Sequence, residues 1–143
     1  MTTACIIALI FSIAAEYGVP GHFVYSIARE ENWTLNPGAV SSPNRNGTRD
    51  RGIMQLNDRY FAHVDWRCPE SNIRAGVRHI RFLLGHPQVQ TYWVAAICYN
   101  AGTAWLVHGR RPPAASLDYA SRVMLRWSEA EIPGTFINKE RYR

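Results

Sequence analysis

Long apolar runs, internal repeats and low-complexity tracts are all missing from this sequence of 143 residues. The longest apolar stretch, Ala4–Ala15, is shorter than the roughly 20 residues that a membrane-spanning helix needs. With 47% hydrophobic and 19% charged residues, the composition also excludes an intrinsically disordered chain. We therefore expect one ordinary globular domain over residues 1–143, without stable insertion into a membrane.

Cysteine is scarce as well. Cys5, Cys68 and Cys98 are the only three, and an odd number excludes a full disulfide framework. A single Cys68–Cys98 bridge with Cys5 left over, and three buried thiols, both remain open. Neither the cysteines nor the five histidines have the spacing of a metal centre, so we expect no metal and no cofactor.

Lysine is almost absent, because Lys139 is the only one among the 16 basic residues, yet the formal net charge is +5. Arginine therefore carries the positive charge, and its planar guanidinium suits carboxylates and phosphates. This charge favours an anionic polymer as the partner, while an aromatic content of 12% also suits flat ligands such as sugars and bases. Cell wall, nucleic acid and membrane surface all stay open at this level.

The stretch Ala4–Ala15 has the apolar character of a signal-peptide core, but no Lys or Arg precedes it. We interpret it as a buried first helix that ends at Glu16–Gly18, before Pro20. On this interpretation no convincing export signal lies within the chain.

Apolar residues recur at helical spacing through most of the chain, which predicts a mainly α fold. Trp33–Asp50 has the composition of an irregular loop, and Gly52–Asn57 is typical of a short strand or a helix start. The tail after Pro133 is weakly patterned. The helices predicted after the first cover Pro20–Glu31, Pro69–Leu84 with a solvated face of Arg74, Arg78 and Arg81, Val89–Asn100 with Gly102 as its cap, and Leu117–Trp127.

One carboxylate stands out by its position. Glu31 lies one turn beyond Ile27 and Ala28, so the helix places it at the edge of the core, whereas Glu30 is expected to face water. Partial burial disfavours the charged form, so Glu31 would keep its proton above the ordinary pKa of about 4.3. A general acid at neutral pH needs this property, although a helix-terminal Glu with a satisfied hydrogen bond would have the same position.

Four motifs around Glu31 resemble those of the lytic transglycosylases. Residues 27–32 followed by Asn36-Pro37-x-Ala39-x-Ser41 are similar to I-A-x-Q-E-S…N-P-x-A-x-S, with Asn32 in place of Ser and one extra residue before Asn36. The other three are Gly52-Ile53-Met54-Gln55, Pro69-x-x-Asn72-Ile73-x-x-Gly76 and Tyr99-Asn100-Ala101-Gly102. Their order matches the family, and the resemblance covers about residues 6–127, leaving a tail over 128–143.

The resemblance implies a goose-type-lysozyme-like helical fold and cleavage of the β-1,4 bond between N-acetylmuramic acid and N-acetylglucosamine in peptidoglycan. It places the single catalytic acid on Glu31. This group first protonates the leaving oxygen and then takes the proton of the muramic acid 6-hydroxyl, which closes a 1,6-anhydro ring. The resemblance further implies substrate-binding or orienting roles for Ser41, Met54, Gln55, Tyr99, Asn100 and Tyr119.

Asp50 keeps a second reaction open. Ordinary glycosidases use two carboxylates, and Asp50-x-Gly-Ile-x-Gln-x-Asn also resembles the segment that carries the second carboxylate of animal-type lysozymes. A hydrolytic muramidase that uses Glu31 and Asp50 is therefore an alternative, as is a non-catalytic cell-wall-binding module. Asp50 could equally form a turn by accepting backbone N–H groups of the loop Asn46-Gly47-Thr48.

The other candidate residues also have structural interpretations. Gln55 could be a buried amide, Tyr99 and Tyr119 core residues, and Asn100 part of a helix C-cap with Gly102. Among the tryptophans, two lie in loops and could form sugar platforms, and three belong to helical patterns and are expected in the core. The loop pair is Trp33 and Trp66, and the core set is Trp93, Trp105 and Trp127.

The expected partner is the peptidoglycan glycan strand, whose carboxylates suit a basic protein. Arginines are spread through the chain without a recognition motif, which argues against a nucleic-acid binder. We expect a monomer that acts outside the cytoplasm, in the periplasm or cell envelope, or as a phage-associated protein.

Overall fold

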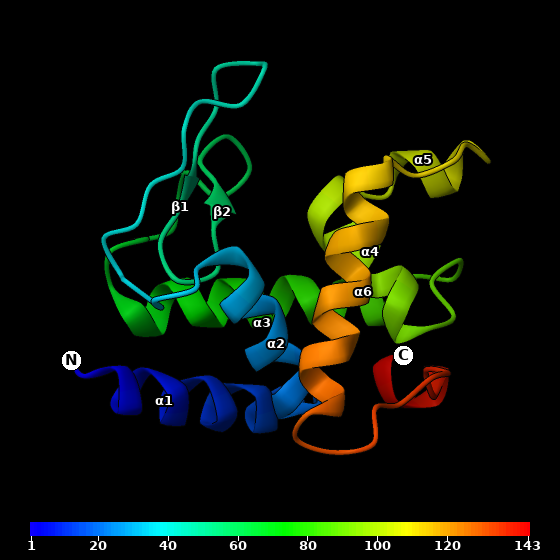
Figure 1. The fold of residues 1–143 in the computed structure, drawn as a ribbon, viewed down its shortest axis with the longest axis horizontal. Coiled ribbons are helices and arrows are strands. Elements are labelled where there is room, and N and C mark those ends of the chain that lie inside the picture. Colours follow the sequence, from blue (N-terminus) through cyan, green and yellow to red (C-terminus); the bar gives the residue numbers. More distant parts are fainter. The chain divides into compact units, whose positions relative to one another are not determined.

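The computed structural model describes residues 1–143, which divide into two compact units, Met1–Arg78 and His79–Arg143. The mainly α prediction is confirmed, because six α-helices and one two-stranded sheet make up the regular structure (Figure 1). Helix α3 (Pro69–Gly85) contributes residues to both units. The units are described in turn.

Helices α1 (Thr3–Glu16) and α2 (Gly21–Glu31) pack against each other in the first unit. Helix α1 begins where the Thr2 side chain accepts a hydrogen bond from the Cys5 N–H, and it ends at Glu16, as predicted. Only one stripe of α1 is buried, around Ile10 and Ile13, while its other side is exposed. The prediction of a buried helix is therefore right for one face alone. No helix of the protein combines the length and the apolar character that crossing a bilayer requires.

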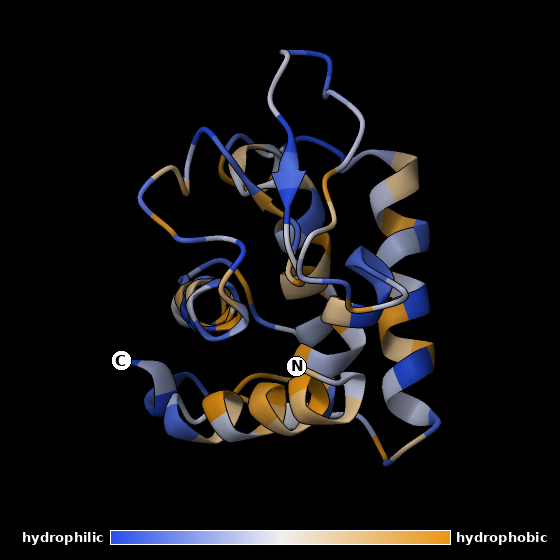
Figure 2. Ribbon diagram, turned by 90° about the vertical axis from the view of Figure 1, so that its left-hand side faces the viewer, coloured by the Kyte–Doolittle hydropathy of each residue, from blue (hydrophilic) through white to orange (hydrophobic).

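A small hairpin follows the loop after α2. Strand β1 (Asp50–Arg51) pairs antiparallel with β2 (Leu56–Asn57), so that Asp50 lies opposite Asn57 and Arg51 opposite Leu56. Val40 forms an isolated bridge to Arg51, which joins the long loop to this hairpin. Figure 2 shows β1 in the hydrophilic colour, in agreement with its half-exposed residues. The ambiguous run Gly52–Asn57 thus forms a turn that leads into a short strand.

Helix α3 has the predicted apolar stripe, since Ile73, Val77, Ile80 and Leu84 are all buried. Its arginine face is not the freely solvated surface that the sequence suggested. Arg74 forms ion pairs with Glu16 and Glu70, and the Arg78 Nε donates to the Tyr17 hydroxyl at 3.5 Å. Two of the arginines therefore connect α3 to the end of α1. The partners in α1 lie about 60 residues away in sequence, which is why helical periodicity could not reveal them.

The third arginine of that face, Arg81, belongs to the second unit, where its guanidinium lies 5.8 Å from the Tyr142 ring centroid. Helices α4 (Tyr92–Ala101) and α6 (Ala114–Ser128) pack side by side there (Figure 1). Tyr92 meets Trp127 edge-on, with ring centroids 5.2 Å apart. A short helix, α5 (Ala104–Val107), lies between them in sequence and was not predicted.

The caps of α4 explain where this helix begins and ends. It starts at Tyr92, later than the predicted Val89, because the Thr91 hydroxyl accepts a hydrogen bond from the Val94 N–H. Gly102 is the C-cap, as predicted, with φ of +77°, a backbone conformation that favours glycine.

The C-terminal tail is anchored despite its weak sequence pattern. It ends in the 3-10 helix η1 (Lys139–Tyr142), and Ile137 and Tyr142 are buried. The Lys139 Nζ donates to three backbone carbonyls, those of Leu84 at 2.6 Å, His86 at 2.7 Å and Val89 at 2.6 Å. The last carbonyls of a helix lack partners within the helix, so the only lysine of the chain caps the Leu84 carbonyl at the end of α3 and also binds two carbonyls of the segment that follows.

All three cysteines are free thiols, which rules out the Cys68–Cys98 bridge. The alternative of three buried thiols holds only for Cys98, because Cys68 is half-buried and Cys5 is exposed.

Among the tryptophans predicted for the core, Trp127 is buried and Trp105 is half-buried. Trp93 is 40% exposed, so that prediction is wrong. The Trp93 prediction failed because helical periodicity assigns a face to a residue without showing whether a neighbour covers it.

Candidate active site

Glu31 is the last residue of α2, about one helical turn after the buried residues Ile27 and Ala28, and it is half-buried. The predicted position at the edge of the core is thus confirmed. Glu30 is also half-buried, which corrects the expectation that it faces water. The end of α2 is covered more evenly than helical geometry alone predicts.

Asn32 holds the end of α2 in place. Its N–H donates to the Ala28 carbonyl at 2.8 Å, and its side-chain Nδ2 donates to the carbonyls of Asn36 at 2.8 Å and Gly52 at 3.3 Å. Its Oδ1 in turn accepts from the Asn36 N–H. The residue after Glu31 therefore links the helix both to the following loop and to the hairpin.

Gln55 is hydrogen-bonded to the same carbonyl. Its Nε2 donates to the Gly52 carbonyl at 2.8 Å and to the Ala39 carbonyl at 3.4 Å. The Gly52 oxygen thus accepts from both Asn32 and Gln55, so one peptide group connects the end of the Glu31 helix with Gln55. Because the Gln55 amide nitrogen is engaged, its Oε1 is left as an acceptor for a hydroxyl or an N–H group.

The turn that carries Gln55 is fixed by α3. Asn72 is fully buried, accepts from the Met54 N–H at 2.8 Å and donates to the Arg51 carbonyl at 3.1 Å. Gly52 has φ of +76°, and a Cβ there would lie 2.5 Å from the Asn72 Nδ2. Gly76 lets the side chain of Met54 approach, since a Cβ on Gly76 would lie 2.7 Å from the Met54 Cγ. Asn72 and Gly76 therefore support the turn.

Two residues of the first unit have an unusual backbone conformation. Leu35 and Gln55 are the only residues other than glycine with positive φ, at +55° and +48°. Such conformations cost about 1–3 kcal/mol each and persist only where the surroundings enforce them. Leu35 is 1% exposed and its N–H donates to the Asn32 carbonyl, so burial and a hydrogen bond hold it. Strained backbone of this kind is common at active sites.

The second unit holds the other motif that the sequence singled out. Tyr99 on α4 is half-buried, with its ring 5.6 Å from that of His79. Burial lowers the pKa of His79, so this imidazole is neutral at neutral pH. Asn100 is exposed, and its Oδ1 accepts from the Ser116 hydroxyl at 2.7 Å. Asn100 thus joins α4 to the start of α6, and Gly102 alone is the cap.

The family described as the Transglycosylase SLT domain matches residues 8–113. The chain belongs to this family. The match covers well over half of the 143 residues and includes Glu31, Gln55, Tyr99 and Asn100. A comparison with curated protein sequences found no match. Membership supports an activity of the transglycosylase type on peptidoglycan.

Within this SLT domain, the first unit contains Glu31, Ser41, Asp50, Met54 and Gln55. Asp50 and Ser41 contact each other, because the Ser41 hydroxyl accepts from the Asp50 N–H at 2.9 Å and the Ser41 N–H donates to the Asp50 carbonyl. The Ser41 side chain thus fastens the loop to β1. Met54 is fully buried and contributes packing.

The carboxylate of Asp50 has other partners than the predicted backbone groups of a turn. It accepts from the side-chain amides of Asn44 at 3.4 Å and Asn57 at 3.2 Å. The neighbouring turn is held instead by Asn46, whose Oδ1 accepts from the Thr48 N–H. Asp50 is therefore a half-buried carboxylate that side-chain amides orient.

Tyr119 is only 5% exposed on α6, which agrees with the core interpretation. The two loop tryptophans are accessible, and both contact arginines. Trp33 is 63% exposed, with the Arg29 guanidinium 4.3 Å from its ring centroid. Trp66 is half-buried and lies near Arg51 and Arg67.

Sequence reasoning missed the roles of Asn32 and Asn72. Both are buried polar side chains that hydrogen-bond to backbone groups far away in sequence. The signal for Asn72 was its place in the motif Pro69-x-x-Asn72-Ile73, next to the apolar residues of a predicted helix. A side-chain amide that is buried at such a place needs hydrogen-bond partners. Asn32 was visible only as a departure from the family pattern.

Proposed function

We propose that this protein is a peptidoglycan lytic transglycosylase. It cleaves the β-1,4 bond between N-acetylmuramic acid and N-acetylglucosamine and forms a 1,6-anhydromuramoyl product. The observation that carries the proposal is how Glu31 and Gln55 are linked. Asn32 directly follows Glu31, and the Gly52 carbonyl accepts hydrogen bonds from the side chains of both Asn32 and Gln55. All of these residues lie inside the region that the family matches.

In this reaction Glu31 acts first as an acid. Its protonated carboxyl donates to the bridging oxygen while the bond from that oxygen to C1 of the muramic acid breaks. The half-buried position of Glu31 supports this role, because partial removal from water favours the neutral form of a carboxyl group. Proton donation of this kind contributes about 10²–10⁴-fold to the rate.

Glu31 then acts as a base. The resulting carboxylate takes the proton of the C6 hydroxyl, whose oxygen bonds to C1 and closes the anhydro ring, so that Glu31 regains its proton. Water takes no part, and one carboxylate suffices. The Oε1 of Gln55 is a suitable acceptor for a substrate hydroxyl or acetamide N–H, because the amide nitrogen is already held by two carbonyls.

The decisive test is the chemical nature of the ends released from purified sacculi. An anhydromuramoyl end is lighter by one water than a reducing end, so mass spectrometry of the digest separates the two reactions. We expect anhydro ends. Reducing ends alone would contradict the transglycosylase reaction and support a muramidase that uses Glu31 and Asp50.

A pair of variants tests the assignment of the acid. Glu31→Gln should lower lysis by at least about 100-fold, because an amide cannot donate the proton. Glu30→Gln is the matched control, since it makes the same change one residue earlier and should keep most of the activity. Thermal melting of both variants checks that they fold. Normal lysis by a folded Glu31→Gln variant would exclude Glu31 as the acid.

We expect the enzyme to act as a monomer on glycan strands outside the cytoplasm, either in the cell envelope or as part of a phage. The net charge of +5 supports its approach to a substrate that carries carboxylates. Sedimentation of the protein alone and with sacculi would test the oligomeric state and the binding together.

A further inference from the structure

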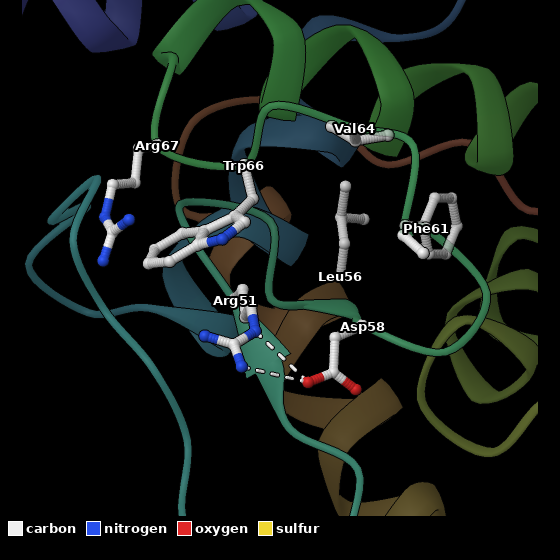
Figure 3. A pocket seen from close by; sticks show the side chains of 8 residues that line it. Arg51, Leu56, Asp58, Phe61, Val64, Trp66 and Arg67 are labelled. Carbon is white, nitrogen blue, oxygen red and sulfur yellow. Dashed lines mark hydrogen bonds and ion pairs between the residues drawn. The ribbon is translucent and has the colours of Figure 1, made fainter.

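The first unit contains a pocket that the mechanism does not use. This pocket of about 460 Å³ lies against the β1–β2 hairpin and the loop that leads into α3 (Figure 3). Leu56, Phe61 and Val64 supply apolar walls, while Arg51, Trp66 and Arg67 gather at the other side. The volume is within the range of pockets that bind small molecules and short peptides.

None of the predicted catalytic or orienting residues lines the pocket, and strand geometry explains why. Successive side chains of a strand point to opposite faces of a sheet. Arg51 and Leu56 are paired in register and both line the pocket. Asp50 and Asn57 are the other register pair, and they hydrogen-bond to each other at 3.2 Å. The hairpin therefore carries Asp50 on one face and this pocket on the other.

The charges of the pocket do not cancel. Arg51 is paired with Asp58, whose Oδ2 accepts from its Nε at 3.2 Å and its Nη2 at 3.1 Å. The Asp58 Oδ1 accepts from the Arg49 N–H, so this carboxylate is fully engaged. Arg67 has no carboxylate partner. The pocket thus keeps one uncompensated guanidinium.

Trp66 lies between the two guanidiniums in Figure 3. The Arg67 Cζ is 4.4 Å from its ring centroid, and the Arg51 Cζ is 5.2 Å away. Such contacts hold a guanidinium over the ring while its N–H groups stay available to a ligand. The pocket therefore suits a ligand with one carboxylate and a small apolar body. The uncompensated arginine and the indole N–H can bind the carboxylate, and the apolar wall can contact the apolar body.

We propose that this pocket binds a peptide stem of peptidoglycan through a free carboxylate, which Arg67 holds beside Trp66. The proposal rests on the proposed function, because that function makes peptidoglycan the substrate. Peptide stems carry both carboxylates and alanine methyl groups, and the latter fit against Leu56 and Phe61. A planar guanidinium pairs with a carboxylate through two parallel hydrogen bonds.

The test measures binding by isothermal titration calorimetry with a synthetic stem tetrapeptide, its fully amidated form and inorganic phosphate. We expect the acid to bind, and amidation to weaken binding at least about 10-fold. Arg67→Gln should weaken binding of the acid about 10-fold, which corresponds to ~1.4 kcal/mol. Arg59→Gln is the matched control, because Arg59 is also exposed and lies 5.8 Å from the Tyr60 ring centroid, but does not line the pocket.

Three results would overturn the proposal: equal binding of the acid and the amide, equal weakening by the two variants, or displacement of the peptide by phosphate at the same concentration. These measurements need no cleavage, so the two proposals fail separately. Peptide binding without lysis of sacculi would contradict the enzymatic reaction alone. Lysis without peptide binding would contradict the stem site alone.

Discussion

Replacing Asn72 by Ala tests how strongly α3 supports the turn that carries Gln55. The Asn72 side chain is fully buried and makes two hydrogen bonds, from the Met54 N–H and to the Arg51 carbonyl. Alanine would remove the hydrogen bonds that this side chain makes to the Met54 N–H and to the Arg51 carbonyl, and each loss costs about 1–3 kcal/mol. We therefore expect Asn72→Ala to lower the free energy of unfolding by about 2–5 kcal/mol.

Urea unfolding followed by circular dichroism measures this loss, and calorimetry should show a melting temperature lower by roughly 6–12 °C. Asn46→Ala is the control, because Asn46 is an exposed asparagine in a turn of the same unit. Its replacement should lower the free energy of unfolding by about 0.5 kcal/mol or less. Lysis by Asn72→Ala, measured well below its melting temperature, should also fall, since the turn of Gln55 loses its support. Equal stability of the two variants would refute this reasoning.

Three further predictions follow from contacts elsewhere in the chain. Gly52→Ala should destabilise the protein by more than about 2 kcal/mol in urea unfolding, because it combines φ of +76° with a Cβ 2.5 Å from the Asn72 Nδ2; an unchanged midpoint would contradict the close approach. Lys139→Met should lower stability by about 2–3 kcal/mol, because three carbonyls lose a charged donor, and wild-type stability would show that the tail contact is weak. Hydrogen bonds with Ser71 lower the pKa of the Cys68 thiol, whereas burial raises that of Cys98 to about 11. Alkylation analysed by mass spectrometry should therefore modify Cys68 from a lower pH upward and leave Cys98 unmodified until the protein unfolds, and early modification of Cys98 would contradict its burial.

The helices could be predicted from the sequence because their information is local. The stripe Ile73, Val77, Ile80 and Leu84 repeats every three to four residues, and all four residues are buried on α3. Gly102 ends α4 for an equally local reason, since it has the backbone conformation that glycine adopts most easily.

What the sequence could not show depends on partners far away in the chain. The Lys139 ammonium contacts carbonyls 50–55 residues earlier, and backbone carbonyls leave no trace in a sequence. The exposed position of Trp93 likewise depends on which elements reach its side of α4.

The candidate site likewise has features that could be predicted from local sequence and features that could not. The position of Glu31 could be predicted from the periodicity of its helix, and the motif residues from their resemblance to a family. The neighbour of Glu31 could not, because Asn32 acts through bonds to Asn36 and Gly52 that form only in the folded chain. That Glu30 is half-buried like Glu31 could not be predicted either, because helical periodicity does not show which other segments cover the end of α2.

The shared carbonyl of Gly52 has a consequence for how this protein tolerates change. The direction of that oxygen is set by one peptide plane, which in turn depends on the positive φ of a glycine 21 positions after Glu31. The end of the Glu31 helix and the side chain of Gln55 therefore both depend on the backbone conformation at Gly52. A single methyl group at position 52 would therefore disturb the hydrogen bonds of Asn32 and Gln55 at the same time.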